Sequence, residues 1–314
     1  MLIDRLKTSA VLISIVAVLL YLDAKMSITG SEGLWLLPLL LFFAIGTAWD
    51  ISTLLLNSGR PIRRNVTIAA TTIVTLSACL PMLWPLMGSD YPPNCPVGHL
   101  GWIVIATTAA VFLILIAEMY HYGIGPKGAI ERTCGGVFVS VYVGLPMALL
   151  VALRSMGDGN WGLAAIMTTI AVTKSTDAGA YFSGKAFGKH KLIPRLSPGK
   201  TREGSVGGIV TATIVAFVCL KWLFPAIAGT ADGPVLTPSI PGIDQPLWGA
   251  LCLGPLLAVT GMIGDLAESL VKRDSGAKDS GSLLPGLGGV WDVTDSLIAA
   301  AMPAFLCFAA GVAA

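Results

Sequence analysis

The stretch "PLWGALCLGPLLAVTGMIGDLAES", residues 246–269, runs for 19 positions without a charged side chain and then reaches Asp265. An α-helix needs about 20 apolar residues to cross the hydrocarbon core of a bilayer. A carboxylate just inside the membrane costs up to about 3 kcal/mol and usually marks a functional position. The stretch therefore predicts a membrane-spanning helix with a chemically important acid near one end.

The rest of the chain has the same apolar character. Hydrophobic residues make up 54% of the 314 positions and charged residues only 12%, about half of the ~25% charged residues of a soluble protein. Most of the apolar runs are close to a spanning length, and they cover residues 9–27, 34–56, 66–87, 102–120, 134–153, 161–181, 205–224, 246–264 and 296–314. We therefore expect an all-α, polytopic integral membrane protein with about nine transmembrane helices.

The basic residues between the runs indicate the orientation. Of the 20 Lys and Arg, 16 fall in the N-terminal segment and in the loops 57–65, 121–133, 182–204 and 265–295. The alternate loops hold only Lys25 and Arg154. Because short cytoplasmic loops keep Lys and Arg, the N-terminus is expected in the cytoplasm, and the C-terminus and the loop 225–245 outside. Asp23 and Lys25 stand where a signal peptide would have small residues, so the first run is expected to stay as an anchor.

Other functional classes find little support in the composition. A net charge of +2 and a pI near 8.2 are too weak to indicate nucleic-acid binding. The six Cys residues show no CxxC or other ligand spacing, so neither a zinc site nor a disulfide framework is indicated.

Two acidic pairs flank the last cytoplasmic loop. Asp265, Glu268, Ser269 and Lys272 stand at i, i+3, i+4 and i+7, which places them on one face of a helix. Asp292 and Asp295 repeat the i, i+3 spacing at the start of the last run. Carboxylates so placed could hold hard cations such as Mg²⁺, which prefer oxygen ligands. Solvated loop charges with ordinary helix-end pairing are the alternative.

A second polar segment, residues 174–208, is rich in cations. Lys174 and Asp177 stand at i, i+3 near the inner end of the sixth run. Six further basic residues follow within the segment: Lys185, Lys189, Lys191, Arg195, Lys200 and Arg202. This density suits an anionic ligand, although acidic lipid headgroups attract juxtamembrane Lys and Arg in the same way.

Both segments resemble one known family. "SLVKRDSGAKDSGSLLPGLGGVWDVTD" (269–295) is similar to the signature of the CDP-diacylglycerol synthases, or phosphatidate cytidylyltransferases. In that signature Ser-x-x-Lys-Arg, Lys-Asp-x-Gly, Pro-x-His-Gly-Gly and Asp-Arg-x-Asp follow in this order. "DAGAYFSGKAFGKHKLIPRLSPGKTREG" (177–204) resembles the family's other recurring segment, which usually ends Ser-Pro-x-Lys-Thr-Trp-Glu-Gly. The two segments occur in the expected order.

The resemblance implies an enzyme that transfers a cytidylyl group from CTP to phosphatidate, giving CDP-diacylglycerol and pyrophosphate in phospholipid biosynthesis. It implies Mg²⁺ or another divalent cation, as one or two ions, held by Asp265 and Asp292. The expected catalytic residues are Lys200, Lys272, Arg273, Lys278 and Asp279. The expected substrate-binding residues are Asp177, Ser197, Thr201, Ser269 and Asp295.

These residues define the expected organisation and setting. We expect one integral membrane domain over 1–314, with N-terminal helices over 1–160 and the active site carried by the helices and cytoplasmic loops of 161–314. The protein is expected in the cell (inner) membrane as a multi-pass protein, with its active site facing the cytoplasm. Its expected partners are CTP, phosphatidate and membrane lipids, with no nucleic acid; a homodimer is compatible with this.

The segments also depart from the family pattern. Leu287 stands at the His position, Val293 at the Arg position, and Arg202 where Trp is frequent. Two other classes therefore stay open. A CTP- or ATP-dependent lipid or polyprenol kinase would use similar phosphate chemistry on the same face. A transporter would place its polar groups at the middle of the bilayer, whereas most ionisable residues here lie at the inner ends of the runs.

Overall fold

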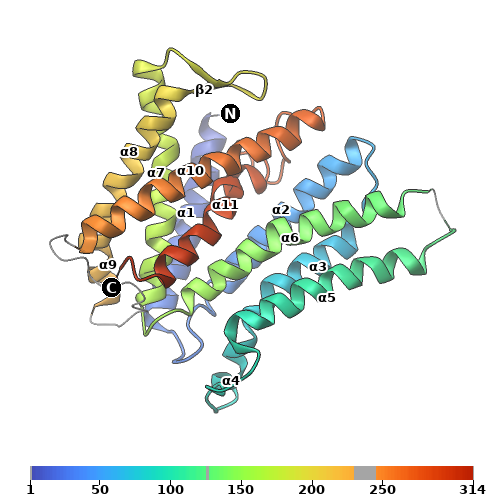
Figure 1. Cartoon of the computed structure of the whole chain (residues 1–314), viewed down its shortest axis with the longest axis horizontal. Coiled ribbons are helices and arrows are strands. Elements are labelled where there is room, and N and C mark those ends of the chain that lie inside the picture. Colours follow the sequence, from blue (N-terminus) through green and yellow to red (C-terminus); the bar gives the residue numbers. More distant parts are fainter. Residues whose placement is uncertain (1, 125–126, 230–244, 314) are drawn as a thin grey trace. The chain divides into compact units, whose positions relative to one another are not determined.

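The structure is a computed structural model that describes residues 2–124, 127–229 and 245–313. Helices dominate the described residues, which confirms the all-α prediction (Figure 1). In chain order the elements are α1 (Leu2–Lys25), α2 (Leu37–Asn57), α3 (Arg64–Ser77), η1 (Leu80–Met82), α4 (Leu83–Leu86), α5 (Gly98–Tyr120), α6 (Ala129–Arg154), α7 (Trp161–Phe187), β1 (Lys191–Ile193), β2 (Ser197–Thr201), α8 (Arg202–Val218), η2 (Cys219–Leu223), α9 (Phe224–Ala228), α10 (Gln245–Asp274) and α11 (Trp291–Ala309).

Seven helical segments of the described chain are long and apolar enough to cross a membrane, or eight if a bent pair counts as one span. The bent pair joins Arg64–Ser77 to Leu80–Leu86 at an angle of 53°. The sequence predicted nine spans, and the difference lies at this bend and at α7. Although α7 is 27 residues long, Lys174, Asp177 and several Thr residues lower its mean hydropathy, and it is not among the candidate spans.

The chain forms two compact units, and α10 and α11 contribute residues to both. The first unit contains Met1–Ala152 and Val271–Thr294. Its α3 and α5 pack through a buried apolar cluster of Ala70, Val74, Ala110 and Ile114. Residues 230–244, which include most of the loop expected outside the membrane, are outside the described residues.

The second unit contains Leu153–Leu270 and Asp295–Ala314. Its α7 and α8 run side by side in unusually close contact (Figure 1). A Cβ atom added to Gly207 of α8 would lie 2.0 Å from the Ser183 Oγ of α7, and one added to Gly179 of α7 would lie 2.4 Å from the Thr211 Oγ1 of α8. Small residues at helix interfaces allow this approach in membrane proteins.

A short antiparallel hairpin, β1 paired with β2, connects α7 to α8. The sequence predicted only a loop here. Glu203, in the first turn of α8, holds the start of the hairpin: its carboxylate accepts hydrogen bonds from the backbone N–H of Lys189 (3.1 Å), and from the backbone N–H (3.2 Å) and ring Nδ1 (2.7 Å) of His190. Thr201 caps α8 by accepting a hydrogen bond from the Gly204 N–H at 3.1 Å. The hairpin therefore places Lys200 directly before the N-terminus of α8.

Candidate active site

Three carboxylates of the second unit lie close together. Asp265 and Glu268 are one turn apart on α10, and Asp295 lies on α11; one oxygen from each falls within 4.8 Å of the others. Glu268 and Asp295 are buried and Asp265 is partly buried. Gly264 makes the approach possible, because a Cβ atom there would lie 2.5 Å from the Asp295 carbonyl oxygen. Within the described residues no other group of three potential ligands is this compact.

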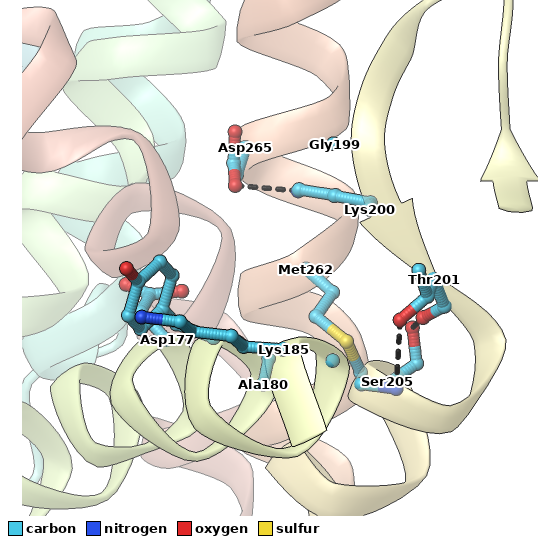
Figure 2. Close-up of a pocket in the computed structure, with 12 residues that line it drawn as sticks. Asp177, Ala180, Lys185, Gly199, Lys200, Thr201, Ser205, Met262 and Asp265 are labelled. Atoms are coloured by element: carbon cyan, nitrogen blue, oxygen red, sulfur yellow. Dashed lines mark hydrogen bonds and ion pairs between the residues drawn. The ribbon is translucent and has the colours of Figure 1, made fainter. Parts of the chain in front are cut away.

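A pocket of about 420 Å³ lies beside Asp265 in the same unit. It is lined by Asp177, Ala180, Tyr181, Gly184, Lys185, Gly199, Lys200, Thr201, Gly204, Ser205, Met262 and Asp265. Figure 2 shows Lys200 reaching from β2 toward Asp265 on α10, and the two side chains form an ion pair at 2.5 Å. The pocket lining therefore contains a paired acid and base from two different elements, with Lys185 of α7 as a second cation.

A further cation of this unit is held by α11. Lys174 of α7 donates a hydrogen bond to the Ser296 Oγ at 3.1 Å, next to Asp295 in the chain. Asp177, one turn further along α7, lines the pocket. The pocket and the carboxylate cluster therefore combine three cations with four acids, and their formal charge is close to balance before any ligand enters.

The carboxylate cluster fits a divalent cation. Mg²⁺ binds oxygen ligands at about 2.1 Å, so two ligand oxygens on one ion lie up to about 4.2 Å apart. The ligand oxygens of the cluster lie within 4.8 Å of one another. A small rotation of the side chains would bring them to the separation that one ion requires. Burying like charges together is costly unless a cation compensates them. The sequence assigned Asp295 to the substrate and left Glu268 out of the ligand set; the geometry favours both as ligands with Asp265.

Asp292 has very different surroundings in the first unit. Its Oδ1 accepts a hydrogen bond from the Lys272 Nζ at 2.8 Å. Its Oδ2 accepts three more, from the Ser280 N–H at 2.9 Å, the Ser280 Oγ at 2.7 Å and the Gly289 N–H at 2.8 Å. Four donors therefore surround this carboxylate, which fastens the loop between α10 and α11 to the first turn of α11.

A second acid of the first unit, Asp50 of α2, supports the same loop. Its side chain is buried, and its Oδ2 accepts a hydrogen bond from the Trp291 N–H at 3.1 Å. Cβ atoms added at Gly281 and Gly289 would each lie 2.4 Å from an Asp50 oxygen. The sequence places Asp50 near the inner end of the second apolar run and indicates a structural role there, so Asp50 is not among the predicted site residues.

The other candidate residues are more dispersed. Arg273, Lys278 and Asp279 are exposed at the end of α10 and in the loop that follows it. Ser197 opens β2 and Ser269 lies on α10, both partly exposed. Of the twelve residues proposed from the sequence, four line the pocket (Asp177, Lys200, Thr201 and Asp265). Lys272 and Asp292 pair with each other in the first unit.

Comparisons with known proteins identify the family. A model of the cytidylyltransferase family matches residues 3–310. A protein of Haemophilus influenzae named phosphatidate cytidylyltransferase is 40% identical over 151 residues, 48% of this chain and 47% of that protein. Proteins of the same name from Brucella suis and Bacillus subtilis are 41% identical over 204 residues (65% of this chain, 64% of theirs) and 34% identical over 189 residues (60% and 63%).

The aligned part thus spans between about half and just under two thirds of the length of these relatives. The family model covers nearly the whole chain, including both polar segments and the three clustered carboxylates. The chain belongs to the cytidylyltransferase family.

Proposed function

We propose that this protein is a phosphatidate cytidylyltransferase, which joins CTP to phosphatidate and releases pyrophosphate. The observation that carries the proposal is the carboxylate cluster next to a lysine-containing pocket, in a chain of the cytidylyltransferase family. The relatives named for this activity add support. Both substrates are polyanions, and the site offers cations together with ligands for a metal.

The reaction sets clear demands on the residues. A phosphate oxygen of phosphatidate forms a bond to the α-phosphorus of CTP, and the bond from that phosphorus to the bridging oxygen breaks, so that pyrophosphate leaves with the electron pair. The attacking phosphate is already ionised near neutral pH, so no strong general base is needed. Lys200 and Lys185 are placed to neutralise charge on the phosphoryl oxygens, as cationic clamps do in phosphoryl transfer.

The carboxylates of Asp265, Glu268 and Asp295 would hold the divalent cation. When bound, it would supply positive charge to the phosphates of the nucleotide and orient them for in-line displacement. Lys200 already pairs with Asp265, so it stands where it can pass from a carboxylate to a phosphate oxygen. Arg273, Lys278 and Asp279 stay proposed catalytic residues, and Ser197 and Ser269 stay proposed substrate-binding residues.

The activity is tested with purified protein in detergent, radiolabelled CTP and dioleoyl phosphatidate. A cytidylyltransferase gives lipid-linked cytidylate and pyrophosphate in equal amounts and depends on a divalent cation. A lipid or polyprenol kinase would instead give a phosphorylated alcohol and a nucleoside diphosphate. Absence of both products, with CTP-independent uptake of a solute into vesicles, would favour a transporter.

We also propose that the N-terminus and the pocket face the cytoplasm and the C-terminus lies outside, in the cell (inner) membrane. Asp158 precedes α7 and Arg195 lies in the hairpin after it, and both are exposed. In a Cys-free background, Asp158→Cys should react with an impermeant maleimide only from outside, and Arg195→Cys only from the cytoplasmic side. Labelling of both from one side would show that α7 does not cross the membrane.

A further inference from the structure

Arg5 and Thr8 of the N-terminal helix α1 contact the loop between α10 and α11, which lies about 280 positions away in the sequence. The Arg5 Nε donates a hydrogen bond to the Gly286 carbonyl at 2.6 Å, and the Thr8 Oγ1 donates one to the Pro285 carbonyl at 2.8 Å. Both donors lie in the first turns of α1, and both acceptors are adjacent. The two hydrogen bonds attach the first turns of α1 to two adjacent residues of the loop.

The backbones approach closely at this point. Gly286 has φ of +79°, and a Cβ atom there would lie 2.8 Å from the Arg5 backbone nitrogen. Two independent features therefore require glycine: the left-handed conformation, which L side chains rarely adopt, and the proximity of α1. The loop can therefore approach α1 this closely only with glycine at position 286.

The contacted loop is held from other directions as well. Leu284 and Gly288 exchange backbone hydrogen bonds (2.9 and 3.0 Å) on either side of the contact point. Gly289 then donates to Asp292, and the next turn is supported by Asp50 through Trp291. A displacement at residues 285 and 286 would therefore be transmitted to the hydrogen bonds of Asp292.

Within the described residues, little of α1 is fully buried by the rest of the protein. Only 6% of its spanning window is buried, and large apolar side chains such as Leu6, Val11 and Ile13 are exposed, as expected for a helix that faces lipid. At its opposite end Asp23 accepts a hydrogen bond from the Gly33 N–H at 3.0 Å. Polar contacts near its two ends therefore help to attach it to the first unit.

We infer that Arg5 and Thr8 are positioning residues, which fasten the loop 281–290 so that Ser280, Gly289 and Asp292 keep the arrangement needed for substrate binding. In this account α1 is part of the catalytic apparatus as well as a membrane anchor. The expectation that only residues 161–314 carry the active site would then be too narrow.

The first test measures amide hydrogen exchange of the full-length protein in detergent micelles. Arg5→Ala combined with Thr8→Val should raise exchange in 281–290 by about tenfold, since each hydrogen bond contributes a few-fold to several-fold to local opening. Exchange in α3 and α5 should not change. The matched control is Lys7→Ala, which removes the same charge from an exposed position in the same turn and should leave the loop unchanged.

The second test measures kinetics and rests on the proposed function. A loosened loop can still close around substrate, so the double variant should raise KM for CTP or phosphatidate by about tenfold and change kcat by less than about threefold. Arg5→Lys and Thr8→Ser keep a donor at each position, so they should retain most of the wild-type value. A purely structural role would lower the amount of active enzyme and leave KM constant.

Unchanged exchange in 281–290 in the double variant would overturn the inference, as would an equal rise in α3 and α5. The exchange test needs no turnover. If the wild-type protein makes no CDP-diacylglycerol while the double variant shows the local rise in exchange, the proposed function is refuted and the attachment of the loop is supported. A local rise with unchanged KM in an active enzyme would refute the positioning role.

Discussion

Asp265 and Asp292 occupy equivalent places in the sequence pattern, yet their surroundings differ sharply. Asp265 lies among acids, with Glu268 and Asp295 within 4.8 Å and one cation, Lys200, paired to it. Asp292 lies among donors and receives four hydrogen bonds from Lys272, Ser280 and Gly289. Three clustered carboxylates offer oxygen ligands for a cation, whereas a carboxylate surrounded by donors is already satisfied.

The difference indicates that Asp265 and Asp292 have different roles, although the same family signature contains both. We propose that the second-unit cluster binds the metal, and that Asp292 organises the loop of the first unit. The single positive charge of the Lys272 ammonium group is shared between Asp292 and any phosphate that it contacts. The ion pair with Asp292 therefore also determines how strongly Lys272 can bind a substrate phosphate.

The largest expected effect is that of Asp265→Asn. Removing this charge weakens the metal site and leaves Lys200 without its ion-pair partner. We expect turnover to fall by at least about 10³-fold, comparable to the loss of a principal electrostatic group in an active site. The divalent concentration for half-maximal rate should rise in the residual activity. Rates are measured with labelled CTP across a Mg²⁺ titration.

Asp274→Asn is the matched control for Asp265→Asn, since Asp274 lies on the same helix, is exposed, and pairs with Arg60 at the surface. Surface pairs contribute little, so its activity and Mg²⁺ dependence should stay near wild type. Wild-type Mg²⁺ dependence in Asp265→Asn would remove this residue from the metal site.

Asp292→Asn should have a smaller effect of a different kind. The amide keeps one acceptor oxygen but loses the charge that holds Lys272, so we expect turnover to fall by about 10–100-fold and the detergent-solubilised protein to lose stability. The half-maximal Mg²⁺ concentration should not change. Parallel Mg²⁺ titrations of this variant and of Asp265→Asn measure the difference between the two sites.

A double-mutant cycle with Lys272→Met tests the same pair. If the two residues act mainly on each other, the double variant loses little more activity than the worse single variant. Strict additivity would show that Asp292 and Lys272 act independently. An increased Mg²⁺ requirement in Asp292→Asn would show that Asp292 acts on the metal.

Gly207→Val tests how the second-unit pocket is supported. The new side chain cannot fit between α8 and Ser183 of α7, so α7 and α8 must separate, at a cost of about 1–3 kcal/mol of stability. Thermal unfolding should occur at lower temperature, with KM for CTP raised. Val206→Leu, at an exposed position next to it, should change neither quantity; equal behaviour of the two variants would contradict close α7–α8 packing.

Much of the fold could be predicted from the sequence, because hydropathy reports directly on long apolar helices. The helical class and most of the spans followed from runs such as 246–264. The status of α7 was harder, since Lys174 and Asp177 lower the hydropathy of an otherwise apolar helix. The hairpin could not be read from its residues alone, since the Glu203 carboxylate that holds it belongs to the following helix.

The site was predicted only in part for a similar reason. Helical spacing identified the stripe of Asp265 and Glu268, but Asp295 joins it through the close α10–α11 contact at Gly264, which one sequence does not reveal. Spacing and the family resemblance also predicted Asp292 as a metal ligand, and this stays a prediction. Its donors come from Ser280 and Gly289, and only the folded loop shows that they converge on it.

The smallest expected effect belongs to Leu287, which stands at the family's His position in the loop that Asp292 organises. A contact that the imidazole would make could instead come from the N–H groups of Gly288 and Gly289 or from Lys278. The two N–H groups are already donors within the loop, to the Leu284 carbonyl and to Asp292, so a contact from these groups is not supported. Lys278, exposed on the same loop, is the candidate that stays.

Leu287→His should therefore change turnover by no more than about tenfold, because the imidazole would add a donor beside a loop whose hydrogen bonds are already made. Lys278→Ala should cost more than Leu287→His gains, and the added His should offset part of that loss if both groups serve the same phosphate. Steady-state rates of the two single variants and the double variant measure this. A rise in turnover of 10³-fold or more in Leu287→His would mean that the native loop lacks an essential catalytic group. The main activity of the protein would then be a different one.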